Sequence, residues 1–130
     1  MRNLAEILDW IQDARTDGIA VVTPELTRLR ASILRDRPGP GNPLWTELQR
    51  VIEAREDQVG KSAVDTANLR LWAALLKALT WRLRSEIDAY REELGDAVRF
   101  AESITAAQTT EGQFNWILPD LQEALKRAGS

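Results

Sequence analysis

The chain contains neither histidine nor cysteine, which limits the chemistry that its side chains could carry out. Histidine is the commonest general base, and the two residue types together supply most zinc ligands. A hydrolytic triad or a zinc site is therefore excluded. An enzyme built from this sequence would have to use carboxylates, Lys, Arg, Ser, Thr or Tyr90.

Four basic residues recur every seven positions, at Arg70, Lys77, Arg84 and Arg91. On a continuous helix this spacing places them in one row, with Trp81 beside it. A basic row next to an aromatic side chain could follow a nucleic-acid backbone and stack a base. Alternatively, the row is the solvent face of an apolar helix, with side-chain stems that cover the core. The net charge of −3 and the nearby acidic residues favour this second interpretation.

The segment Glu92-Glu93-Leu94-Gly95-Asp96 resembles the second metal-binding motif of the all-α nucleotide pyrophosphohydrolases, the MazG-like family. In that family a Glu-x-x-Asp on one helix faces a Glu-x-x-Glu on another, and together they hold Mg²⁺, which prefers hard oxygen ligands. The resemblance implies that Glu93 and Asp96 supply the second motif. Glu53 and Glu56 would supply the first.

Between these two acidic pairs lie residues 57–92, which is 36 positions, whereas the family joins its motifs by a shorter segment. A hydrophobic helix is expected in that interval. We therefore interpret the acidic pairs as solvated helix ends and predict no metal site, no cofactor and no catalytic residue. Convergence of the four carboxylates in the fold would instead favour the enzyme.

Five tryptophans in 130 residues are several-fold above the usual share, at Trp10, Trp45, Trp72, Trp81 and Trp116. Core packing explains most of them, yet tryptophan is also a favoured interface anchor. Trp81 lies nearest the basic row and Trp116 lies in an irregular segment, so these two are expected to be the most exposed. The candidate partner-binding residues are therefore Trp81, Trp116 and the four basic residues of the row.

The segment 69–83 is apolar on almost every side and predicts a central helix. A helix with one buried stripe needs an apolar arc of about 100°, so neighbouring helices are expected to surround this one. Ser62 and Asp65 form a capping-box pattern at its start. We predict that this helix runs over about 62–94. At Gly95 the helix could continue or restart, because glycine costs only about 1 kcal/mol in a helix interior.

Helix-start signals mark the other elements, at Asn3, Thr23-Pro24 and Asn42-Pro43. The Pro/Gly-rich segment 37–43 cannot be helical and is expected to be a loop. Residues 19–22 are apolar and rich in β-branched residues, but no second strand is evident, so we predict a buried extended connector. Together these patterns predict an all-α fold, a single domain over 1–130 with five or six helices bundled around the central helix.

These observations favour a non-enzymatic interaction or adaptor protein, a subunit of a larger assembly or an inhibitor of one, acting through a protein partner or a homo-oligomer. Two alternatives stay open: the Mg²⁺-dependent pyrophosphohydrolase, and a nucleic-acid-contacting small subunit of a nucleoprotein complex. No apolar run approaches the roughly 18–20 residues that a bilayer crossing needs. The N-terminus lacks a secretory signal pattern. A cytoplasmic protein without membrane contact is expected.

Overall fold

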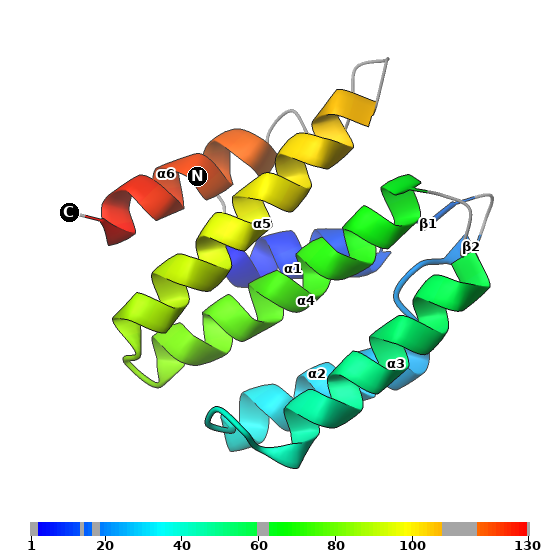
Figure 1. Ribbon diagram of the computed structural model, residues 1–130, viewed down its shortest axis with the longest axis horizontal. Coiled ribbons are helices and arrows are strands. Elements are labelled where there is room, and N and C mark those ends of the chain that lie inside the picture. The colour runs from blue at the N-terminus through cyan, green and yellow to red at the C-terminus, as the bar shows by residue number, and fades with distance from the viewer. Residues whose placement is uncertain (1–2, 14, 17–18, 60–62, 108–116, 130) are drawn as a thin grey trace.

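The computed structural model describes residues 3–13, 15–16, 19–59, 63–107 and 117–129. Within these residues the fold is all-α, as predicted, with helices packed as a bundle (Figure 1). The helices are α1 (Leu4–Asp13), α2 (Pro24–Asp36), α3 (Pro43–Val59), α4 (Ala63–Leu83), α5 (Ile87–Ala107) and α6 (Ile117–Ala128). None of these helices combines the length and the apolar character that a membrane crossing requires.

The helix starts predicted at Asn3, Thr23 and Asn42 are confirmed, because each is capped by the expected side chain, whereas Ser62 of the predicted capping box lies outside the described residues. Asn3 Oδ1 accepts the backbone N–H of Glu6 at 2.9 Å. Thr23 Oγ1 accepts a backbone N–H of the first turn of α2 at 3.3 Å, and Asn42 Oδ1 accepts one from α3 at 2.9 Å. These bonds satisfy amide hydrogens that have no partner inside the helix. Residues 37–42 between α2 and α3 are non-helical, which confirms the predicted loop.

The prediction of one continuous helix over 62–94 is wrong. α4 ends at Leu83, and α5 folds back along it to form a helical hairpin (Figure 1). Ser85 adopts a left-handed conformation with φ of 61°, and the backbone N–H of Glu86 donates to the carbonyl of Trp81 at 2.9 Å. This is a Schellman stop with serine in place of the usual glycine. Gly95 lies inside α5, so the helix continues through it.

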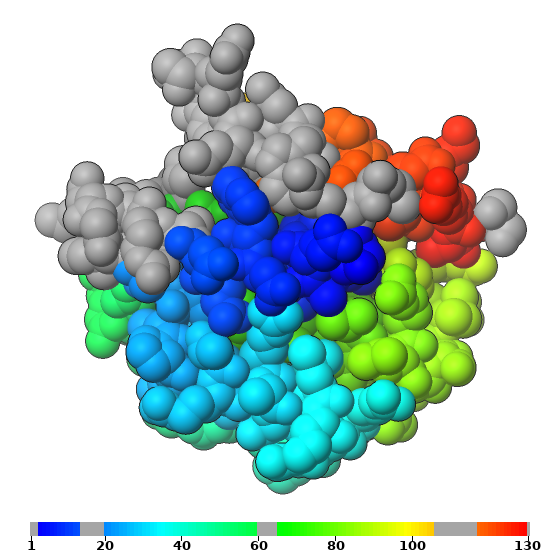
Figure 2. All heavy atoms as spheres, turned by 180° about the vertical axis from the view of Figure 1, so that it is seen from behind, coloured from blue at the N-terminus to red at the C-terminus, as the bar shows by residue number. Residues whose placement is uncertain are grey.

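The central role predicted for the apolar helix is confirmed for α4, which packs against α1, α2, α3 and α5. Leu69, Trp72 and Leu76 are fully buried, and four apolar residues of α1 are buried with them, namely Leu4, Ile7, Leu8 and Ile11. Figure 2 shows that α1 and α2 cover the face of the molecule opposite to that in Figure 1. α5 also contacts α6. The core therefore lies around α4, and α6 is attached to it through α5.

The connector after α1 is paired, contrary to expectation. Strand β1 (Arg15–Thr16) runs antiparallel to strand β2 (Ile19–Ala20). Val21 and Val22, which follow, are buried as predicted. Pairing satisfies backbone groups that an isolated extended segment would have left without partners.

Candidate functional site

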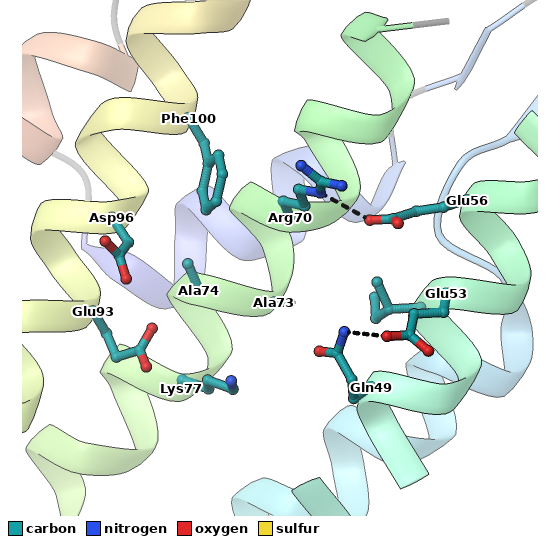
Figure 3. Close-up of a pocket in the computed structure, with 11 residues that line it drawn as sticks. Gln49, Glu53, Glu56, Arg70, Ala73, Ala74, Lys77, Glu93, Asp96 and Phe100 are labelled. Carbon is teal, nitrogen blue, oxygen red and sulfur yellow. Dashed lines mark hydrogen bonds and ion pairs between the residues drawn. The ribbon is translucent and has the colours of Figure 1, made fainter. Parts of the chain in front are cut away.

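A hollow of about 420 Å³ lies between α3, α4 and α5, and we call it the cleft (Figure 3). Ala73 and Ala74 of α4 line its floor. Their short side chains leave room between the two walls. The walls consist of Gln49, Ile52, Glu53 and Glu56 from α3, and of Glu93, Asp96 and Phe100 from α5. Its volume falls within the range of small-molecule sites.

The two acidic pairs singled out in the sequence converge on this cleft. Glu53 and Glu56 line it from α3, and Glu93 and Asp96 line it from α5 (Figure 3). The four residues lie inside α3 and α5, so their placement at helix ends is wrong, although Glu53 is exposed to solvent as expected. The pairs line opposite walls because the hydrophobic helix between them forms the floor of the cleft and the chain then turns back at Ser85. Among the described residues, however, no three acidic side chains lie close enough to enclose a metal ion by themselves.

Two basic residues of α4 also line the cleft. Arg70 Nε donates to Glu56 Oε1 at 3.0 Å. Lys77 lies two turns further along the same face of α4. Its positive charge lowers the pKa of the Glu93 carboxyl. Four carboxylates against two cations leave the lining net acidic, although Glu56 is paired with Arg70 and Asp96 with Arg99 outside the cleft. Such a site attracts divalent cations, while its two fixed positive charges can contact an anion.

Arg84 and Arg91 do not extend this pair into a basic row. Arg84 follows the end of α4, and it donates to the carbonyl of Arg37 at 2.9 Å and to Glu86 Oε2 at 3.1 Å. Arg91 lies on α5, where it bonds the backbone carbonyl of Ala128. The expectation of one row is wrong because α4 ends at Leu83. The observation that favoured a nucleic-acid interface is thereby removed.

Glu93 is half-buried, and this burial raises the pKa of its carboxyl above the ordinary value. The nearby positive charge of Lys77 lowers the pKa, the negative charge of Glu92 raises it, and a hydrogen bond from Trp81 lowers it. Burial is the largest of these effects, so the net shift is upward. Glu93 therefore holds its proton more tightly than a glutamate in water.

Trp81 is 7 % exposed, so the expectation that it would be among the most exposed tryptophans is wrong. Its ring packs against that of Trp45, with ring centroids 5.3 Å apart and planes tilted by 44°. Trp81 is therefore part of the core, and its indole lies near enough to Glu93 to act on the pKa of that carboxyl. Trp116, the other tryptophan expected to be exposed, lies outside the described residues.

The floor of the cleft was not predicted from the sequence. Ala73 and Ala74 lie on the same helical face as Arg70 and Lys77, as positions i+3, i+4 and i+7 from Arg70 do. One signal was available in the sequence. Two adjacent alanines lie between basic residues in a helix that is otherwise rich in leucine and tryptophan, and such small side chains can leave a hollow. The two alanines mark the face of α4 that lies between α3 and α5 and lines the cleft.

No family model, curated protein or solved structure matches this chain. A functional assignment must therefore rest on the geometry and chemistry of the cleft.

Proposed function

We propose that the protein binds a nucleoside triphosphate together with Mg²⁺ in the cleft and hydrolyses it to a nucleoside monophosphate and pyrophosphate. One observation carries this proposal: two carboxylate pairs and two cations line the same hollow. This is the arrangement that the resemblance to all-α nucleotide pyrophosphohydrolases implies for the two acidic pairs. The non-enzymatic role favoured by the sequence becomes the second candidate.

The donor set of the cleft fits Mg²⁺. This ion usually keeps several water ligands and is held by only one or two carboxylates together with substrate phosphates. A preassembled group of three carboxylates is therefore not required. Asp96 on one wall, with Glu53 and Glu56 on the other, would hold the ion, which leaves Glu93 unligated. When bound, Mg²⁺ would neutralise phosphate charge and polarise the phosphoryl group.

The two cations of α4 suit the phosphate chain. Arg70 uses its Nε–H to bond Glu56, which leaves the terminal N–H groups of its guanidinium for phosphate oxygens. Lys77 acts on Glu93 and adds a compact positive charge to the cleft. Together they hold the triphosphate against the floor, so that its reacting bond lies between the two acidic walls.

Glu93 has the properties of a proton acceptor for the attacking water. Its raised pKa makes its carboxylate a stronger base than an exposed glutamate. In this assignment Glu93 takes the proton of the attacking water.

Turnover tests the proposal directly. Incubation with nucleoside triphosphates and Mg²⁺ should release pyrophosphate, and the Glu93→Gln variant should lower the rate by at least about 100-fold, as expected on loss of a general base. Glu102→Gln is the matched control, because Glu102 is an exposed residue of the same helix that does not line the cleft. No pyrophosphate release with any nucleotide, or equal rates in Glu93→Gln and the wild type, would contradict the proposal.

A second candidate function is protein binding at the turn between α4 and α5. Leu83 and Ile87 are 40 % and 45 % exposed, and they are close in sequence on this turn. Exposed apolar side chains that cluster favour an interface. Light scattering at micromolar concentration tests a homo-oligomer, which should dissociate in a Leu83→Ser/Ile87→Ser double variant. A monomeric wild type that also recovers no partner from its native host would contradict this candidate.

A further inference from the structure

A second hollow, of about 510 Å³, adjoins the cleft. The two hollows share Gln49, Glu53 and Lys77, so one ligand can extend from the first into the second. We propose that the second hollow receives the nucleobase and sugar of a nucleotide whose phosphates occupy the cleft. This inference rests on the proposed function and names the part of the molecule that would select among nucleotides.

The two hollows differ in chemistry. The cleft is lined by four carboxylates and two cations, whereas the second hollow adds neutral hydrogen-bonding side chains and an indole, from Asn42, Thr46 and Trp45. Aromatic side chains stack nucleobases, and amides and hydroxyls bond their polar edges. The charged end therefore suits phosphates, and the neutral end suits a base.

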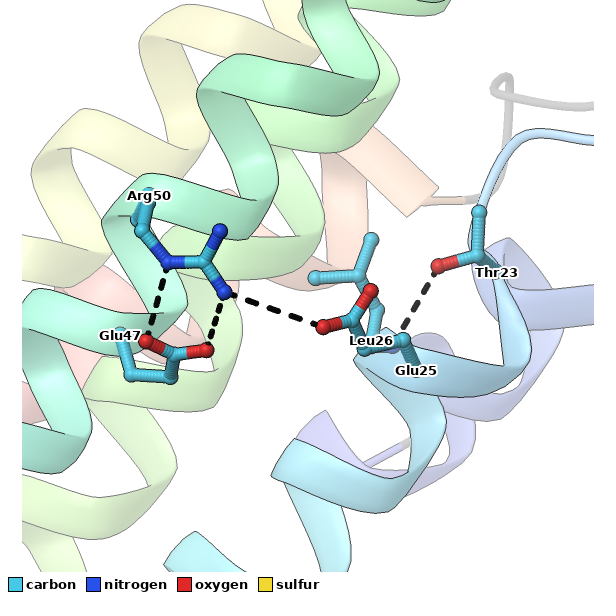
Figure 4. Close-up of polar contacts among 5 residues, drawn as sticks. All are labelled: Thr23, Glu25, Leu26, Glu47 and Arg50. Atoms are coloured by element: carbon cyan, nitrogen blue, oxygen red, sulfur yellow. Dashed lines mark hydrogen bonds and ion pairs between the residues drawn. The ribbon is translucent and has the colours of Figure 1, made fainter.

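Arg50 also lines the second hollow, but its guanidinium forms ion pairs with carboxylates that do not line it. Its guanidinium donates to Glu47 through Nε at 3.0 Å and lies 4.0 Å from Glu25 of α2 (Figure 4). This hydrogen bond holds the pKa of the Glu47 carboxyl below its ordinary value. Arg50 is thus directed toward α2, and Lys77 marks the boundary between the hollow and the cleft.

Trp45 is held in place before any ligand binds. Its indole N–H donates to the carbonyl of Pro38 at 3.3 Å, and its ring packs on Trp81. Gln49 Nε2 donates to Glu53 Oε1 at 2.9 Å, and within the described part of the chain no donor reaches Gln49 Oε1. A fixed aromatic platform beside an available amide oxygen is a preorganised site for a base, because little further ordering is needed on binding.

The opposite end of the cleft has an aromatic residue too, but its chemistry is less suited to a base. Phe100 lies beside Asp96 and the Arg70–Glu56 ion pair (Figure 3). Apart from the shared Gln49, the described residues that line the cleft include no neutral hydrogen-bonding side chain. A base at this end would meet charged groups that are already paired.

Calorimetry with three kinds of probe tests the inference. The probes are Mg²⁺–tripolyphosphate, the α,β-methylene analogues of the four common nucleoside triphosphates with Mg²⁺, and the free nucleosides. At least one analogue should bind about tenfold or more tightly than tripolyphosphate, the gain expected from one stacked base. Thr46→Trp, which fills the hollow, should abolish this gain and leave tripolyphosphate binding unchanged. Ala54→Trp, an exposed position on α3 that lines neither hollow, is the control.

Each outcome separates the inference from the proposed function. Equal affinity for tripolyphosphate and every analogue, or a gain that persists in Thr46→Trp, overturns the base site and leaves the Mg²⁺–phosphate cleft intact. If Phe100→Leu abolishes the gain in analogue affinity and Thr46→Trp does not, the base lies at the opposite end of the cleft, and the base site in the second hollow is overturned. Binding of analogues or nucleosides that Thr46→Trp abolishes, without any tripolyphosphate binding, supports the base site and contradicts the proposed function. No binding of any probe overturns both.

Discussion

At the scale of single residues, Glu93 carries a burial cost that core packing does not explain. Its carboxyl is half-buried and its pKa is raised, so the folded protein is destabilised when Glu93 is ionised. Residues with such costs are concentrated at functional sites. The sequence could predict Glu93 as a candidate ligand, because a local motif was sufficient. It could not predict the burial of Trp81, because that tryptophan packs on Trp45 of a separate helix.

The raised pKa of Glu93 predicts a defined pH dependence of stability. Because the folded state binds this proton more tightly than the unfolded chain, the wild type should lose stability relative to Glu93→Gln as pH rises above about 4.5, the ordinary value. The difference should level off once pH exceeds the raised pKa. Urea unfolding of both proteins at several pH values between 4 and 7.5 measures it. A wild type that gains stability relative to the variant over this interval would show that the pKa is lowered instead.

At the scale of elements, the starts of α1, α2 and α3 could be predicted because each depends on a cap within three residues of it. The end of α4 could not be predicted from the sequence. Leu69, Leu76 and Leu83 continue one apolar row, and residues 84–86 contain neither glycine nor proline. The stop depends on Ser85 in a left-handed conformation, which serine adopts only at a cost.

The turn at Ser85 predicts opposite effects of two substitutions. Ser85→Gly should raise the free energy of unfolding by up to about 1 kcal/mol, because glycine adopts positive φ without steric cost. Ser85→Val should lower it by about 1–2 kcal/mol, because a β-branched residue is disfavoured there. Denaturant unfolding of the two variants beside the wild type measures both. Equal midpoints for glycine and valine would refute a left-handed residue at this turn.

The burial of α4 predicts a large effect at its centre. Leu76 is fully buried, so Leu76→Ala should lower the free energy of unfolding by about 2–5 kcal/mol through lost transfer energy and a new cavity. Ala54→Ser, on an exposed surface of α3, should change it by less than about 0.5 kcal/mol. A denaturant midpoint for Leu76→Ala that equals that of the wild type would show that α4 does not form the core.

At the scale of the whole molecule, the cleft depends on three helices whose lining residues span Gln49 to Phe100. The resemblance in the sequence indicated the acidic pairs, but their convergence follows from the turn at Ser85 and from the packing of α3 on α4. Neither is encoded by a local pattern. From the sequence, the apolar helix expected between the two pairs led us to predict no metal site. In the fold its Ala73–Ala74 face forms the floor instead.

The most direct test of the account is the location of a bound divalent cation. Mn²⁺, a paramagnetic substitute for Mg²⁺, should be titrated into isotope-labelled protein with tripolyphosphate present, and the broadening of backbone amide signals recorded. We predict that the signals broadened first belong to two segments far apart in sequence, around residues 53–56 and 93–96, and that Glu93→Gln weakens the effect at both. Broadening confined to other acidic surfaces, or none at either segment, would contradict the central claim that the two carboxylate pairs form one site.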